Sequence, residues 1–121
     1  MAAYLPKFAG SEPFTKLASA DIIGGRLVSA SGANTVANSG ADVATVIGVA
    51  GDDALNGAPV TVYPRPAGVH PLVASAAIAV GAKVMSAAGG KVATIGAGAN
   101  PIGIALEAAA ADLDVIDVLF I

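Results

Sequence analysis

Short runs of β-branched and other apolar residues, separated by turns that contain glycine, recur along the chain. Runs of this length, bounded by Gly, Asn and Ser, are typical of β-strands. The pattern predicts these strands: Arg26–Ala30, Thr35–Ala37, Thr45–Ala50, Pro59–Tyr63, Gly68–Leu72, Lys83–Ser86, Lys91–Ala93, Gly103–Glu107 and Asp114–Phe120. Glycine in the links between strands tolerates the positive φ that tight turns need. The sequence therefore predicts an all-β fold of short strands.

Three alanine-rich segments interrupt this pattern: Ser19–Ile23, Ser75–Val80 and Glu107–Asp112. Alanine has the highest helix propensity, so each segment is predicted to form one helical turn. Segments this short are not stable as helices without tertiary packing. We therefore expect short helical turns and little helix overall.

An internal repeat relates the two parts of the chain. Placing Phe14–Ala37 over His70–Ala93 superposes eight identical residues: Ala18, Ser19, Ala20, Ile22, Gly25, Val28, Val36 and Ala37. With a shift of one residue the match continues, so that Val46–Ala50 falls on Pro101–Ala105. The sequence predicts two similar halves, residues 14–63 and 70–118, within a single β domain of residues 14–121.

The first thirteen residues, Met1–Pro13, have no counterpart in the second half. They contain two aromatic residues and two prolines, whereas a disordered tail usually carries more charge and fewer aromatics. We therefore expect an extended N-terminal arm that orders against the surface or sheet edge of a neighbouring molecule.

The composition points to an assembly. Hydrophobic residues make up 55% of the chain and charged residues 12%, and small residues supply the excess, with 29 alanines and 15 glycines. A surface so poor in charge exposes apolar patches that a partner covers. The net charge of −3 and the six scattered Lys and Arg residues argue against nucleic acid as that partner.

A membrane partner is not expected either. The longest apolar stretches, Leu72–Ala82 and Val92–Leu106, are shorter than the ~20 residues that a spanning helix needs. The N-terminal residues lack the basic and apolar regions of a secretory signal, so we expect synthesis in a cytoplasm. The chain has no cysteine, so no disulfide framework is available.

The residues that carry chemistry are few. The single histidine, His70, lies in a predicted strand between Val69 and Pro71, so we interpret it as a structural or surface residue. The glycine-rich stretch Gly96–Pro101 lacks the third glycine of a dinucleotide loop and is interpreted as a loop between strands. We predict no enzymatic activity and no cofactor.

Acidic residues gather at two places. Asp112, Asp114 and Asp117 lie close together, but they lack the glycine and distal glutamate of a calcium loop. Asp52 and Asp53 precede Asn-Gly and read as a turn. We interpret both groups as turns and solvated faces, and predict no metal site.

The link between the halves, Tyr63–Gly68, contains two prolines that fix φ and make it stiff. Arg65 lies at its centre. Two interpretations of this arginine stay open, a contact with a carboxylate of a partner and a side chain that is merely solvated.

The repeated order Ala-Ser-Ala-x-Ile-x-x-Gly, at Ala18–Gly25 and Ala74–Gly81, the Ile-Gly strands Val46–Ala50 and Pro101–Ala105, and Pro59–Tyr63 together resemble bacteriophage capsid decoration (cement) proteins. The resemblance covers about residues 14–118. It implies a small β-barrel or β-tulip-like domain, similar in role to the lambda-type head decoration protein. That role is to bind the outer face of the virion capsid and stabilise it.

The resemblance also implies the partners. They are the major capsid protein and the chain itself, as a homotrimer at three-fold and quasi-three-fold positions. The candidate residues for contacts with the capsid or a neighbour are Tyr4, Leu5, Lys7, Phe8, Phe14 and Arg65. The alternative is a carbohydrate- or ligand-binding module of the β-clip type, which would use aromatic side chains for sugar stacking.

Overall fold

A computed structural model of the protein describes residues 12–65 and 68–121, and strands dominate both segments. The strands are β1 (Phe14–Ala18), β2 (Leu27–Gly32), β3 (Thr35–Asn38), β4 (Val46–Ala50), β5 (Pro59–Pro64), β6 (Val69–Val73), β7 (Lys83–Ala87), β8 (Lys91–Thr94), β9 (Pro101–Ala105) and β10 (Val115–Phe120). One 3-10 turn, η1 (Ala88–Gly90), joins β7 to β8. The all-β prediction is confirmed, and each of the nine predicted strands is present within two residues of its expected bounds.

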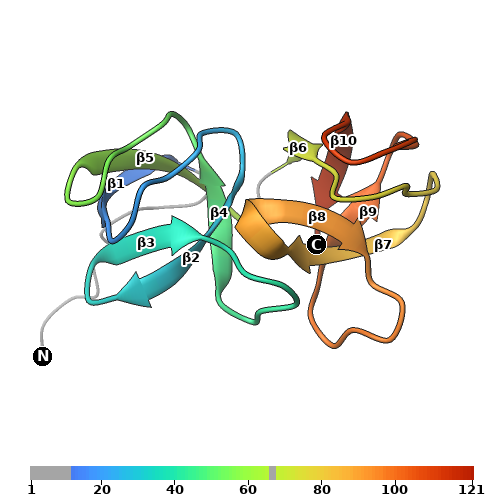
Figure 1. The fold of residues 1–121 in the computed structure, drawn as a ribbon, viewed down its shortest axis with the longest axis horizontal. Coiled ribbons are helices and arrows are strands. Elements are labelled where there is room, and N and C mark those ends of the chain that lie inside the picture. The colour runs from blue at the N-terminus through green and yellow to red at the C-terminus, as the bar shows by residue number, and fades with distance from the viewer. Residues whose placement is uncertain (1–11, 66–67) are drawn as a thin grey trace, which may run out of the picture.

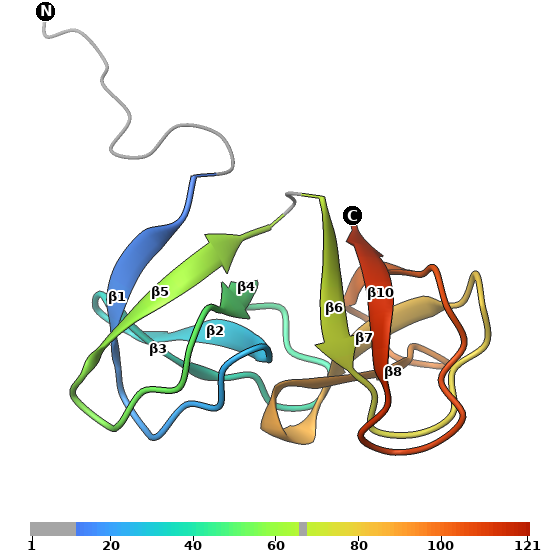
Figure 2. The same cartoon turned by 90° about the horizontal axis from the view of Figure 1, so that it is seen from above.

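Two five-stranded units lie side by side (Figure 1). The first is a closed barrel in the order β1-β3-β2-β4-β5, and the second is a sheet in the order β6-β10-β9-β7-β8. Seen from above, β1 and β5 of the first unit and β6 and β10 of the second lie toward the viewer (Figure 2). Strands β6 to β10 are the counterparts of β1 to β5, in the same sequence order. Each pair of neighbouring strands in the second sheet therefore corresponds to a pair in the barrel, although the second order is written from β6 in the opposite direction around the barrel.

The registers of the two units correspond residue by residue. Phe14 faces Val62 in the first unit and His70 faces Val118 in the second. Smaller bridges repeat as well, since Ile22 pairs with Ala54 and Ile78 pairs with Ala109. The parallel contact between Ala18 and Val36 recurs as the single bridge between Ala74 and Val92. The halves therefore share one backbone plan.

Glycine is required at the centre of β4 and β9. A Cβ on Gly48 would lie 2.1 Å from the carbonyl oxygen of Tyr63, and one on Gly103 would lie 2.6 Å from the carbonyl oxygen of Leu119. Both distances are too short for any side chain, so the neighbouring strand can approach only because these positions lack a Cβ. This is the physical reason for the repeated Ile-Gly motif.

Two apolar clusters form the core. One belongs to the first half and includes Val28, Val60 and Val62. The other fills the second half but also contains Leu27, Val46 and Val49 from the first half. One cluster thus draws on both halves, and the single domain of residues 14–121 stays a prediction.

The prediction of helical turns in the three alanine-rich segments is wrong. Their backbone is extended or bent, and Ile22 and Ile78 form bridges instead, with Ile22 N–H donating to Ala54 O at 2.7 Å and Ile78 N–H to Ala109 O at 3.0 Å. A turn of helix gains at most one hydrogen bond for several fixed residues, so pairing with the neighbouring loop wins.

The first strand, β1, was not predicted. In this strand Lys16 is half-buried and Leu17 is 49% exposed, which reverses the usual apolar-in, polar-out alternation. The hydrophobic pattern therefore gave no strand signal there. Within the described residues, no helix has the length and apolar character needed to cross a bilayer.

Candidate assembly surface

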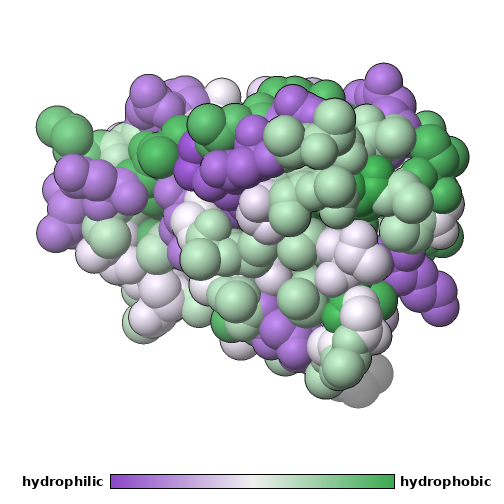
Figure 3. Space-filling model, turned by 45° about the vertical axis from the view of Figure 1, so that its right-hand side comes forward, coloured by the Kyte–Doolittle hydropathy of each residue, from purple (hydrophilic) through white to green (hydrophobic). Residues whose placement is uncertain are grey.

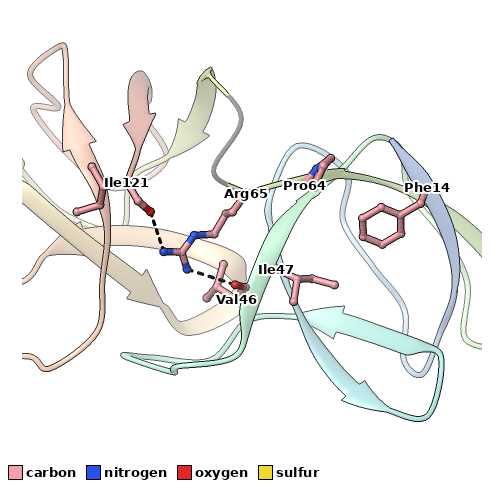
Figure 4. Close-up of a pocket in the computed structure, with 6 residues that line it drawn as sticks. All are labelled: Phe14, Val46, Ile47, Pro64, Arg65 and Ile121. Atoms are coloured by element: carbon pink, nitrogen blue, oxygen red, sulfur yellow. Dashed lines mark hydrogen bonds between the residues drawn. The ribbon is translucent and has the colours of Figure 1, made fainter. Parts of the chain in front are cut away.

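An open hollow of about 570 Å³ lies where the two halves meet. Its lining comes from β1, β4, the end of β5 with the residue after it, and the residue after β10: Phe14, Val46, Ile47, Pro64, Arg65 and Ile121. Figure 4 shows Phe14 and Ile47 on the side of the first half, and Ile121 on the side of the second. The structure thus brings Phe14 and Arg65, two of the residues expected to make contacts, to one site.

Arg65 connects the two halves through the backbone. Its guanidinium donates to the carbonyl oxygen of Val46 at 3.2 Å and to that of Ile121 at 3.1 Å. Its own N–H donates to Ile47 O at 2.9 Å. Partial burial lowers the pKa of Arg65 below its usual value, and the guanidinium remains charged at any physiological pH. The side chain of Arg65 is therefore hydrogen-bonded to backbone carbonyls of its own chain. This differs from both interpretations of the sequence, a contact with a partner's carboxylate and a solvated side chain.

The loop between β3 and β4 forms a second junction. The carboxylate of Asp42 accepts the N–H of Ala99 at 3.0 Å and that of Asn100 at 2.9 Å. The amide of Asn100 returns a hydrogen bond to the carbonyl of Asp42 at 2.9 Å. The backbone N–H donors at Ala99 and Asn100 hold the pKa of Asp42 below its usual value. Asp42 thus joins the two halves, a contact for which the sequence carries no local signal.

Phe14 begins β1 beside the hollow and packs against the core cluster of the first half. The Nζ of Lys16 lies 6.0 Å from the centre of its ring, at the outer limit of a cation–π contact. Tyr4, Leu5, Lys7 and Phe8, the remaining candidate contact residues, lie outside the described residues, so their role stays a prediction.

The outer face of β6 and β10 carries several exposed apolar side chains on either side of the exposed Asp117. Val69 and Leu119 face each other across the two strands and are 49% and 38% exposed, and Val115 is 61% exposed. Ile121, which lines the hollow, is also exposed. On the side of the molecule seen in Figure 3, pale and green residues adjoin one another between groups of purple residues. Adjoining apolar residues of this kind mark a surface that a partner covers.

His70 belongs to strand packing. It lies in β6, opposite Val118 of β10, and its ring centre is 4.9 Å from that of Phe120 at an interplanar angle of 45°. This is the spacing of an aromatic contact. The position agrees with the interpretation of His70 as a structural residue.

The acidic residues serve turns and an exposed ion pair. Lys91 Nζ lies 2.8 Å from Asp112 Oδ1, and this contact lowers the pKa of Asp112. Asp114 accepts the N–H groups of Ala110 and Ala111 at 2.8 and 3.1 Å, which closes a turn before β10. In residues 12–65 and 68–121 no three metal-binding side chains gather at one place.

These features define a class. The fold repeats one five-stranded β unit and presents exposed apolar side chains. Its histidine and several of its carboxylates serve packing and turns, so it has the properties of a structural protein that works through its surface. A model of the phage cement protein family matches residues 11–120, which is nearly the whole chain. The chain belongs to the phage cement protein family. It is a capsid-associated structural protein, and its family is not a class of enzymes.

A solved structure shows the same fold. The head fiber gp8.5 N base of bacteriophage phi29 superposes with a TM-score of 0.74, at 18% sequence identity, over 93% of this chain and 95% of that one. At this identity the likeness establishes the fold alone. No protein among those with curated descriptions matches the sequence.

Proposed function

We propose that this protein binds the outer surface of a phage capsid, contacts the major capsid protein and stabilises the head. The observation that carries the proposal is the match of the cement protein family to residues 11–120. We propose further that it acts as a homotrimer at three-fold and quasi-three-fold positions of the virion, after synthesis in the cytoplasm of the bacterial host.

The surface supports this role. Ile121, which lines the hollow beside Arg65, follows directly on β10, whose outward side chains include Val115 and Leu119. The hollow and this face therefore lie near each other along the chain and both offer exposed apolar side chains. A capsid presents many copies of one site, and a trimer binds such an array through three linked contacts. Contacts that are weak singly then give strong attachment.

The test is co-sedimentation of the purified protein with expanded heads that lack it, with unexpanded heads as the comparison. We expect saturable binding near one trimer per three-fold site, together with a higher temperature of head disruption. Absence of binding would contradict the proposal. Binding to glycans in its place would favour the ligand-binding module.

Two variants test whether the outer face of β6 and β10 makes the capsid contact. Leu119→Asp places a charge in the exposed apolar face and should abolish binding, whereas Val80→Asp, at a position 65% exposed in the second half, should leave it unchanged. Both variants must keep the circular dichroism spectrum of the parent. Equal binding by the two would place the capsid contact elsewhere.

A further inference from the structure

A notch of about 270 Å³ lies on the first half, between the loop after β1 and the loop after β4. Its lining consists of Asp21, Ile22, Ile23, Asp53, Ala54 and Leu55. Ile23 is 50% exposed and Leu55 72% exposed, and a carboxylate stands near each. The notch therefore offers apolar contact and negative charge together.

The notch is rigid because hydrogen bonds join its two loops. Ile22 and Ala54 exchange backbone hydrogen bonds of 2.7 and 3.1 Å. Gly24 N–H donates to Asp53 Oδ1 at 2.7 Å, and Asn56 N–H donates to Asp21 Oδ1 at 2.9 Å. A site built in advance loses little conformational entropy when a ligand binds.

The second half shows which of these side chains the fold itself does not need. Its equivalent loops form the same bridge, between Ile78 and Ala109. The four outward positions of the notch are all alanine there: Asp21, Ile23, Asp53 and Leu55 correspond to Ala77, Ala79, Ala108 and Ala110. The bridge therefore forms with alanine at all four positions. Asp21 and Asp53 serve the loops of the first half by accepting backbone hydrogen bonds, but the large exposed side chains of Ile23 and Leu55 call for a reason other than folding.

We propose that this notch receives the N-terminal arm of a neighbouring copy, with Leu5 and Phe8 against Ile23 and Leu55 and with Lys7 beside the carboxylates. The inference rests on the proposed function, since it names the contact that would hold the trimer together. Charge complementarity supports it, because Lys7 is the one charged residue among the first eleven, up to Ser11, and stands between apolar neighbours.

The position of the notch favours a neighbour over the same chain. The arm enters the barrel at Phe14, and β1 runs about 17 Å before the loop that forms the notch. The chain's own arm would have to return along that whole length, whereas the arm of another copy can approach directly. A contact between two different patches is heterologous, and such a contact forms a ring of three copies when each copy is rotated by a third of a turn relative to the next.

Cross-linking tests the contact directly, because the chain has no cysteine and introduced thiols are therefore unambiguous. A Lys7→Cys chain is mixed with a mass-tagged Leu55→Cys chain under mild oxidation. We expect a covalent dimer of one tagged and one untagged chain. The matched control replaces Leu55→Cys with Val80→Cys, at another exposed position, and should give at least about tenfold less product.

Two outcomes would overturn the inference. One is equal cross-linking at Leu55 and Val80. The other is a link that forms only within a single chain carrying both cysteines, which would show that the arm folds back on its own notch.

Sedimentation of the full-length chain gives an independent readout. Ile23→Ala with Leu55→Ala installs the alanines of the second half, so the fold is expected to persist. We expect this variant and Lys7→Glu each to weaken self-association by about tenfold or more, and their combination to add little. Unchanged self-association would overturn the inference. If head binding were lost at the same time, the notch would be a capsid contact and the proposed function would stand.

Discussion

The two halves of this protein share strand order and register but differ in how they close. In the first half β1 pairs with β3 through two residues and with β5 through four, which completes the barrel. In the second half the equivalent closure is the single bridge between Ala74 and Val92. The second half has instead a larger core cluster, which incorporates Leu27, Val46 and Val49 of the first. The comparison shows that one strand arrangement can be stabilised either by strand pairing within its own barrel or by apolar side chains from the adjoining half of the chain.

Separating the halves gives the largest expected effect. A fragment of residues 68–121 loses the apolar side chains that the first half contributes to its cluster, and it should fail to fold. Its circular dichroism and amide exchange should be those of an unfolded chain, and the full-length protein should unfold in one transition. A folded fragment with protected amides would show that the halves are independent domains.

Replacement of the central glycine of β4 or β9 should have the next largest effect, and the effect should differ between the halves. Gly48→Ala meets the carbonyl oxygen of Tyr63 at 2.1 Å and Gly103→Ala that of Leu119 at 2.6 Å. We expect losses of about 3 kcal/mol or more in the free energy of unfolding, larger for Gly48→Ala. Urea denaturation measures both.

The matched control is Gly40→Ala, whose Cβ would lie 3.7 Å from Val43 Cγ1, an ordinary contact. It should cost far less than either replacement. A small effect at Gly48 would mean that the strands move apart without loss of packing.

Acid should weaken the junction through Asp42. Its pKa in the folded chain lies below that in the unfolded chain, so its contribution to stability is complete above the unfolded value of about 3.9 and is lost as the pH falls through the folded pKa. Asp42→Asn should remove this part of the acid dependence. Residues 95–100, the equivalent loop of the second half, contain no carboxylate that could replace it.

Stability of both chains measured by urea denaturation between pH 2 and pH 7 checks this prediction. Parallel pH profiles for the parent and Asp42→Asn would show that the hydrogen bonds of Asp42 to Ala99 and Asn100 do not contribute.

The smallest effect concerns one turn. Gly57 has a φ of 88°, and its counterpart Leu113 has a φ of 73°. Both donate the same hydrogen bond, to Ala18 O at 2.7 Å and to Ala74 O at 2.8 Å. Leu113→Gly should stabilise the protein by about 0.5–1 kcal/mol, because a leucine at positive φ is strained.

The reciprocal replacement is the control. Gly57→Leu should destabilise by about 1 kcal/mol through the backbone alone, since a Cβ there has no neighbour within 4 Å. Thermal unfolding resolves both shifts, and changes of the same sign in the two variants would contradict this explanation.

Much of the architecture was present in the sequence because strands and turns leave local signals. Runs of valine and isoleucine located nine strands, and the repeat predicted two similar halves. The helical turns predicted for the alanine-rich segments are absent. The helix propensity of alanine decides little when a neighbouring loop offers hydrogen bonds to Ile22 and Ile78. Strand β1 was missed because Lys16 and Leu17 invert the usual pattern.

The contact surfaces were only partly predictable. Phe14 and Arg65 were singled out, but their meeting at one hollow depends on pairing between strands far apart in the sequence. The notch is visible in the sequence as a difference between the two repeats. When the halves are aligned, Leu55 of the first half corresponds to an alanine of the second. Comparing side chains at equivalent positions, in addition to matching them, would have located it.

Closure of the first barrel has a consequence for crowding. Each of its strands is paired on both sides, so its backbone N–H and C=O groups are largely engaged within the barrel. Strand edges left open are templates for aggregation, above all where many copies of one chain stand close together. A protein proposed to coat a particle at high local density gains from a barrel of this kind, because the first halves of adjacent copies then meet through side chains and do not extend one another's sheets.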